Sequence, residues 1–238
     1  MHPDLARRAL AEAVGSALLV AIVVGSGIFA QRLSPDEVGL QLLESSIATG
    51  AGLVALVLCL GSVSGAHLNP VVSLVDRCLG GLSTRELAAY LPSQVAGACV
   101  GAVVANLMFD LPAVTWSTHE RTSGGVWLGE AVATFGLLLV ILGVVRAGRS
   151  SAVPFAVGGY VAAAYWFTSS TSFANPAVTV GRTLTDTFAG IAPSSVPAFV
   201  VFQLVGGAVA LAVGWYLFQE PERPPVGLLV AHETEEHR

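Results

Sequence analysis

The chain has 238 residues, of which 54% are hydrophobic and only 11% are charged, with a mean hydropathy of +0.73 and a net charge of −5. A soluble globular domain carries about 25% charged residues, so this composition predicts an integral membrane protein and argues against a nucleic-acid-binding protein. Six apolar stretches approach the roughly 20 residues that span a bilayer. They are residues 10–31, 42–63, 87–108, 127–145, 153–171 and 197–218.

The basic residues predict the orientation of these spans. An even number of spans places both termini on one side of the membrane, and the chain has no Lys, so Arg alone sets the side. With cytoplasmic termini, eight Arg lie inside and three (Arg32, Arg121 and Arg182) lie outside. This distribution satisfies the positive-inside rule and predicts that both termini are cytoplasmic.

The order of polar markers along the spans indicates an internal repeat. "AEAVGSALLV" resembles "GEAVATFGLLLV", each with a Glu early in its span, and "SQVAGACVGAVVA" resembles "FQLVGGAVALAV", each with a Gln. Three spans per half is an odd number, so the second half enters the membrane from the opposite face. We expect one membrane domain over residues 1–220, with inverted repeats at about 8–109 and 126–218, and a disordered cytoplasmic tail at 221–238.

An Asn-Pro pair follows the second span of each half. The chain has only three Asn, and Asn69 and Asn175 both precede Pro. Asn is a favoured N-cap and Pro a favoured first helical residue, so each pair predicts a short helix, ending near Gly80-Gly81 in the first half and Gly190 in the second. Such helices would cross about half of the hydrocarbon core and meet near its middle.

Two half-helices of this kind imply a lumen. Non-helical backbone at membrane depth is tolerated only where protein buries it or where it lines a watery cavity. The facing N-termini each carry about +0.5 charge and repel cations and protons. A capping Asn commits its oxygen to backbone N–H groups, which leaves its NH₂ group to donate to an uncharged solute. The loops "GSVSGAH" and "TSSTSFA" can present backbone carbonyls as acceptors.

Three ionisable side chains lie near these loops. We interpret Glu12 and Glu130 as loop supports that accept hydrogen bonds from the loop of their own half; a proton relay is the alternative. His67 either lines the lumen or anchors its loop. No nucleophile, base and orienting group occur at usable spacing, and neither do a metal-ligand cluster or a cofactor motif, so an enzyme is disfavoured.

The chain resembles the aquaporin, or major intrinsic protein, family over nearly its whole length. The resemblance rests on "SGAHLNPVVS" and "SFANPAVT", which are similar to the paired NPA motifs of that family. It implies six transmembrane helices with two re-entrant half-helices, a homotetramer with one pore per protomer, and passive flux of water or small neutral solutes. The implied motif residues are Asn69, Pro70, Val71, Asn175, Pro176 and Ala177.

Two departures from the family pattern bear on selectivity. Val71 stands in place of Ala in the first motif, and Val178 follows the second motif where most members have Arg. The remaining positions of the implied outer filter are Thr49, Ala163 and Ser172. This set predicts a wider, less polar constriction that favours glycerol-like polyols, and "NPAV" resembles a bacterial subgroup associated with arsenite.

Arg182 lies one helical turn after Val178. We hypothesise that it reaches back toward the filter and keeps a positive field there; the alternative is a pair with Asp186 or with a neighbouring protomer. The competing functions are an ion-coupled transporter and a non-conducting structural membrane protein. The expected partners are small neutral solutes, the lipid bilayer of a bacterial plasma membrane and further copies of the chain.

Overall fold

The computed structural model describes residues 4–218, which are all-helical apart from their loops. Eight α-helices follow one another, joined in places by short 3₁₀ turns at Ser150–Ala152, Arg182–Leu184 and Pro193–Ser195. The α-helices are α1 (Leu5–Leu33), α2 (Val38–Ser64), α3 (Pro70–Cys78), α4 (Thr84–Met108), α5 (Gly124–Arg146), α6 (Val153–Phe167), α7 (Pro176–Gly181) and α8 (Val196–Leu217). The predicted all-α membrane fold is confirmed. The predicted tail, 221–238, lies outside the described residues.

The long helices match the predicted spans, with one shorter than expected. Five helices of the described chain, α1, α2, α4, α5 and α8, are long and apolar enough to cross a membrane. The fifth predicted span, 153–171, ends at Phe167, so α6 has 15 residues. It ends there because Thr168 is extended and the chain then enters the loop before the second Asn-Pro pair.

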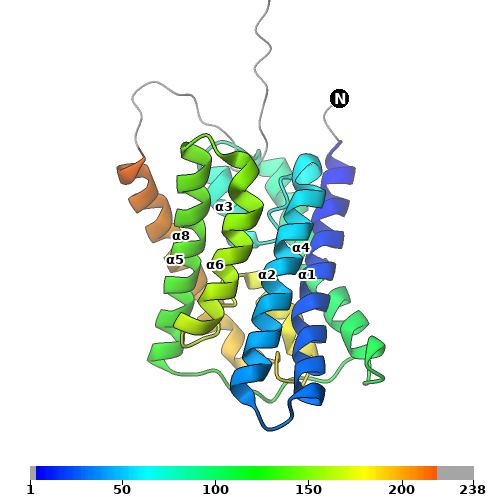
Figure 1. Ribbon diagram of the computed structural model, residues 1–238. Helices are drawn as coiled ribbons and strands as arrows, with labels where there is room; N and C mark the ends of the chain where they lie inside the picture. Colours follow the sequence, from blue (N-terminus) through cyan, green and yellow to red (C-terminus); the bar gives the residue numbers. More distant parts are fainter. Residues whose placement is uncertain (1–3, 219–238) are drawn as a thin grey trace, which may run out of the picture.

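The two short helices also differ in length from the sequence prediction. Helix α3 has nine residues and ends before Gly80, close to the expected position. Helix α7 has six residues and continues as the 3₁₀ turn at 182–184, well before Gly190. Figure 1 shows α3 in the upper half of the helix bundle and the yellow α7 segment in the lower half.

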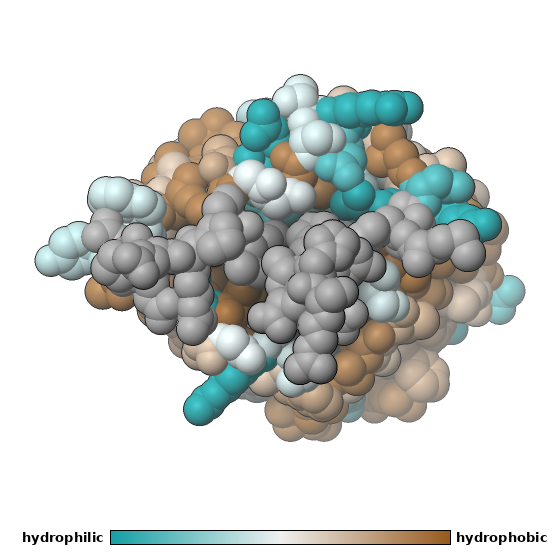
Figure 2. Space-filling model, turned by 90° about the horizontal axis from the view of Figure 1, so that it is seen from above, coloured by the Kyte–Doolittle hydropathy of each residue, from teal (hydrophilic) through white to brown (hydrophobic). Residues whose placement is uncertain are grey.

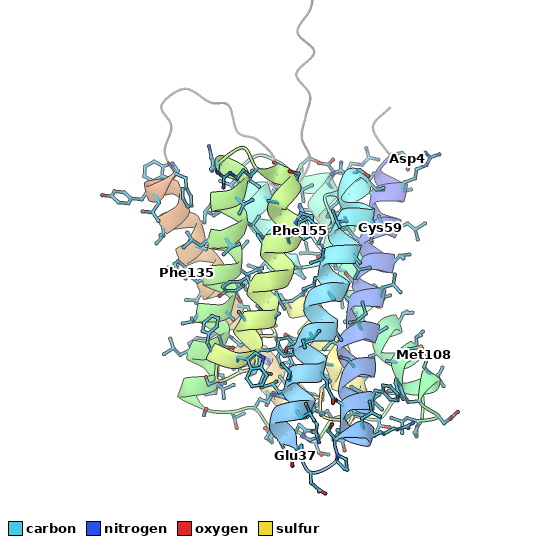
Figure 3. The ribbon with its side chains drawn as sticks, in the orientation of Figure 1. Asp4, Glu37, Cys59, Met108, Phe135 and Phe155 are labelled. Atoms are coloured by element: carbon cyan, nitrogen blue, oxygen red, sulfur yellow. The ribbon has the colours of Figure 1, made fainter. Side chains whose placement is uncertain are left out.

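The helices pack as two similar halves. Helix α1 packs against α4 in the first half and α5 packs against α8 in the second, while α2 packs against α6 between them. Asp4, at the start of α1, and Glu37, just before α2, lie at opposite ends of the bundle, whereas Phe155 and Met108 lie on its sides and are exposed (Figure 3). Seen from the end that carries Asp4, hydrophilic patches lie on the end face and hydrophobic residues occupy much of the periphery (Figure 2).

Glycine permits the closest helix contacts within each half. A Cβ atom added to Gly97 in α4 would lie 2.1 Å from the carbonyl oxygen of Ala13 in α1, and one added to Gly206 in α8 would lie 2.3 Å from that of Ala131 in α5. Small residues of this kind let membrane helices approach through their backbones. The approach keeps Glu12 of α1 and Gln94 of α4 within hydrogen-bond distance of each other.

We predict that Gly97→Ala lowers stability by about 1–3 kcal/mol relative to Gly159→Ala, because only the first overpacks a helix contact. Gly159 lies within α6 and has open space around its Cα atom, so the helix-propensity gain from Ala is common to both variants. Thermal unfolding in detergent measures the difference. Equal melting temperatures would show that the α1–α4 contact can yield without cost.

Candidate functional site

Both Asn residues cap the helices that follow them. The side-chain oxygen of Asn69 accepts a hydrogen bond from the Val71 N–H at 3.0 Å. That of Asn175 accepts from the N–H groups of Ala177 and Val178 at 3.0 and 3.2 Å. In each case Pro occupies the first turn, where a missing N–H costs nothing. The N-termini of α3 and α7 are therefore fixed by the caps predicted from the sequence.

The amide nitrogens of the same two residues join the halves. Asn69 Nδ2 donates to the carbonyl oxygen of Ala174, and Asn175 Nδ2 donates to that of Leu68, both at 2.7 Å. Each NH₂ group has two N–H donors, so one from each Asn is committed to the partner loop. The sequence prediction left the whole NH₂ group for a solute; the structure leaves one N–H per Asn for that purpose.

The backbone before each Asn adopts a strained conformation. Ala66 and Leu68 in the first loop, and Ser172 and Ala174 in the second, all have φ between 46° and 53°. Left-handed backbone costs a residue with a side chain about 1–2 kcal/mol, so something must hold these residues in place. The residues lie three and one positions before each Asn, which shows that the repeat extends to individual backbone angles.

Two buried carboxylates hold the loops. Glu12 accepts from the backbone N–H groups of His67 and Leu68 at 3.0 and 2.7 Å. Glu130 accepts from those of Phe173 and Ala174, both at 2.9 Å. Each Glu is fully buried and lies on the first long helix of its half. The left-handed residues turn these N–H groups away from the backbone carbonyls of the loop. The carboxylates accept their hydrogen bonds instead.

Two glutamines, noticed in the sequence only as repeat markers, complete these networks. Gln94 Nε2 donates to Glu12 at 2.7 Å and to Ser73 Oγ at 2.9 Å. Gln203 Nε2 donates to Glu130 at 2.5 Å and to Thr179 Oγ1 at 2.9 Å. Each Gln therefore ties the carboxylate of its half to the half-helix of the same half. The two Gln occupy equivalent positions after the Asn-Pro pair of each half, and this repeated position could have identified them as site residues.

His67 combines the two roles left open by the sequence. Its side chain lines the central cavity. Its Nδ1 lies 3.0 Å from Ser73 Oγ, and its Nε2 lies 3.6 Å from a carboxylate oxygen of Asp76 on α3. The ring also meets the edge of Tyr90 at a centroid distance of 5.6 Å. His67 is thus a wall residue that is oriented by the helix following its own loop.

A cavity of about 60 Å³ lies between the two Asn residues and extends along the bundle. Both Asn side chains, the loop residues 66–68 and 172–174, and Thr49, Tyr165, Val178 and Arg182 line it. The rest of its wall is aliphatic: Leu19, Val23, Leu53, Val57, Val72, Leu137, Ile141, Val153, Val157 and Val161. The wall therefore offers a few polar groups on an otherwise apolar surface, an arrangement typical of sites for small molecules.

Three of the four expected filter residues line this cavity, and one does not. Thr49, Ser172 and Val178 are buried in its wall, whereas Ala163 is exposed on the outer face of α6 and its assignment was wrong. Tyr165, two residues later, takes the place in the wall, and its hydroxyl lies 3.0 Å from Thr49 Oγ1. Counting from the Asn-Pro pair does not fix the rotation of α6, which decides which of its residues faces the cavity.

Arg182 reaches the same region of the cavity. It is only 5% exposed, its Nε donates to the Ala189 carbonyl, and its guanidinium carbon lies 3.4 Å from the ring centroid of Phe173. Asp186, the alternative partner, accepts hydrogen bonds from Thr118. The backbone N–H of Thr118 holds the pKa of the Asp186 carboxyl below its usual range. The side chain of Arg182 thus lies against the cavity, one turn after Val178.

Comparisons with known proteins agree on one family. The model of the family described as "Major intrinsic protein" matches residues 1–172. An aquaglyceroporin, AqpS, of Rhizobium meliloti is 54% identical over 93% of this chain and 94% of its own length. A glycerol uptake facilitator protein of Pseudomonas aeruginosa is 30% identical over 99% of this chain and 97% of its own. The X-ray structure of the aquaglyceroporin from Plasmodium falciparum superposes with a TM-score of 0.70 at 21% identity, covering 90% of this chain and 96% of that one.

We predict that Glu130→Gln lowers the melting temperature in detergent, because the new amide nitrogen would face N–H donors instead of accepting from them. An unpaired buried donor costs about 1–3 kcal/mol. Glu37→Gln is the matched control, since Glu37 is exposed and its side chain makes no cap hydrogen bond to α2. If both variants melt like the wild type, the second loop does not depend on its carboxylate.

Proposed function

Because the chain belongs to the major intrinsic protein family, whose members are membrane channels and not enzymes, we propose that it passes neutral solutes of glycerol size, arsenite among them. The family and the aquaglyceroporin relatives support a channel for small neutral solutes such as water and glycerol. The finer assignment rests on one observation. Val178, buried in the cavity wall, occupies the position where an Arg would add a charge and narrow the opening.

The lining suits a solute that has several hydroxyl groups and little charge. One N–H of each Asn remains to donate, and the two loops contribute carbonyls and hydroxyls to the lining as acceptors. Most of the remaining lining is aliphatic. Arsenite in its neutral form, As(OH)₃, and glycerol both carry three hydroxyl groups, so the same groups serve both solutes.

Ion exclusion follows from the two capped half-helices. Their N-termini face the cavity from opposite halves, and each carries about half a positive charge from aligned peptide dipoles. No carboxylate lines the cavity among residues 4–218. A cation or a proton between the Asn residues would therefore meet positive ends without a compensating charge.

Assembly and orientation are part of the same proposal. We assign the chain to a bacterial plasma membrane as a homotetramer with one channel per protomer. The two ends of the described chain lie at the same end of the bundle (Figure 1), which fits termini on a shared side. Within the described residues, the predicted orientation puts six Arg on that side against three on the other, so we assign this side to the cytoplasm.

Flux into proteoliposomes tests the solute assignment. We predict that the wild type passes glycerol and arsenite without an ion gradient, and that Val178→Arg reduces both fluxes about tenfold or more, equivalent to about 1.4 kcal/mol in the barrier. Val114→Arg is the matched control, because Val114 lies exposed in the loop between α4 and α5. Uptake against a gradient that depends on an ion would indicate a transporter, and absence of any flux would indicate a structural protein.

Arg182 is proposed to guard the channel against cations. We predict that Arg182→Ala raises sodium conductance several-fold, since a buried charge acts through a low effective dielectric. Arg182→Lys retains the charge and is expected to keep conductance near the wild-type value. Unchanged sodium and glycerol flux in Arg182→Ala would remove the guard role.

A further inference from the structure

A second cavity, of about 140 Å³, adjoins the central one at the end of the bundle that carries Glu37, opposite the chain termini (Figure 3). We call it the vestibule cavity. It shares Val23, Tyr165 and Arg182 with the central cavity. The remaining residues of its lining are Val38, Leu42, Ser45, Arg121, Thr171, Phe188 and Ala189. A solute moving between this end and Val178 passes beside Arg182.

Two guanidinium groups of this lining lie against one aromatic ring, that of Phe173 in the wall of the central cavity. The guanidinium carbon of Arg182 is 3.4 Å, and that of Arg121 is 5.1 Å, from the ring centroid of Phe173. The two arginines come from segments far apart in the chain, the loop before α5 and the 3₁₀ turn after α7. Phe173 belongs to the loop held by Glu130, so the position of both charges is tied to the channel wall.

These charges are poorly matched by acceptors of the protein. In the described part of the chain, Arg182 makes one hydrogen bond, through Nε to the Ala189 carbonyl, which leaves four of its five N–H donors without a protein acceptor. Arg121 donates to the carbonyls of Gly190 and Phe188 at 3.0 and 3.4 Å. Neither guanidinium forms an ion pair with a carboxylate within residues 4–218.

Two carboxylates close to these arginines in space or in sequence are committed elsewhere. Glu130 lies beneath the loop, and its oxygens accept from Phe173, Ala174 and Gln203. Glu120 accepts from the hydroxyls of Ser194 and Ser195. Burial lowers the pKa of the Arg121 guanidinium, and the charge of the Glu130 carboxylate offsets this effect only in part. The vestibule cavity thus has a surplus of positive charge and of N–H donors.

We propose that the vestibule cavity binds a small monocarboxylate between Arg121 and Arg182. A planar carboxylate matches the fork of a guanidinium, and charge-assisted hydrogen bonds of this type are about twice as strong as neutral ones. Ser45 and Thr171 place hydroxyls in the same lining, and Val38 and Leu42 provide an apolar surface for a short alkyl group. The bound anion lies beside the entry to the central cavity and lowers the flux of neutral solutes through it.

Acetate binding to the purified protein in detergent tests the site without reference to flux. Isothermal titration at constant ionic strength is expected to give saturable binding that weakens at least tenfold in Arg121→Gln and in Arg182→Gln. Arg32→Gln is the matched control; Arg32 donates to the Phe109 carbonyl at the same end of the bundle, outside the vestibule cavity, and acetate should bind this variant as it binds the wild type. Equal binding to all four proteins, or to none, overturns the proposal.

If a Gln variant does not fold, the charge-preserving substitutions Arg121→Lys and Arg182→Lys test the same guanidinium groups. A Lys lacks the planar fork, so each is expected to bind acetate more weakly than the wild type does but to retain measurable binding. The melting temperature of each variant without acetate reports folding. A folded Lys variant with wild-type acetate affinity at either position would overturn the role of that guanidinium.

The effect on flux rests on the proposed function and is measured separately. Acetate at equal concentration inside and outside proteoliposomes is expected to reduce glycerol flux through the wild type and to leave flux through Arg121→Gln unchanged. Acetate that binds through the two arginines without reducing flux overturns the inhibitory effect. If the protein carries no solute even without acetate, the proposed function fails while the titration still decides the site.

Discussion

The structure depends on two buried carboxylates, which lie at a depth where the N–H groups of the loops have few other acceptors. Each loop before an Asn turns through left-handed residues that carry side chains, and these turns direct successive N–H groups away from any backbone partner. Without water at that depth, each unpaired N–H would cost several kcal/mol. Glu12 and Glu130 receive these N–H groups. Because the carboxylates lie on the first long helices of the halves, the loop geometry is set by the helix bundle.

The sequence predicted the parts of the site that obey local rules. Asn before Pro is a capping signal at any position in a chain, and a Glu in an apolar span has to find donors, so Asn69, Asn175, Glu12 and Glu130 could be located. The six spans and their pairing into halves followed from hydropathy and repeated markers. Those features need only short-range patterns or the rule that buried polar groups are satisfied.

Other parts of the site depend on three-dimensional packing. Ala163 and Tyr165 both lie on α6, and which of them faces the lumen depends on the rotation of that helix against α2. No hydropathy pattern fixes this rotation, because both faces of α6 are apolar. Left-handed angles at non-glycine residues also run against local preference and arise only because Glu12 and Glu130 hold the loops. The contact of Arg121 with Phe173 joins segments about 50 residues apart and leaves no mark in the sequence.

The reciprocal hydrogen bonds between the Asn residues have a consequence for biosynthesis. The acceptor for Asn69 is the carbonyl of Ala174, and the acceptor for Asn175 is that of Leu68. During synthesis the first half of the chain enters the membrane before the second half. Until the second half has followed, the Asn69 amide lacks its acceptor and α3 lacks its partner half-helix. An unfinished chain cannot form the conducting centre, so a nascent or truncated copy does not become a leak.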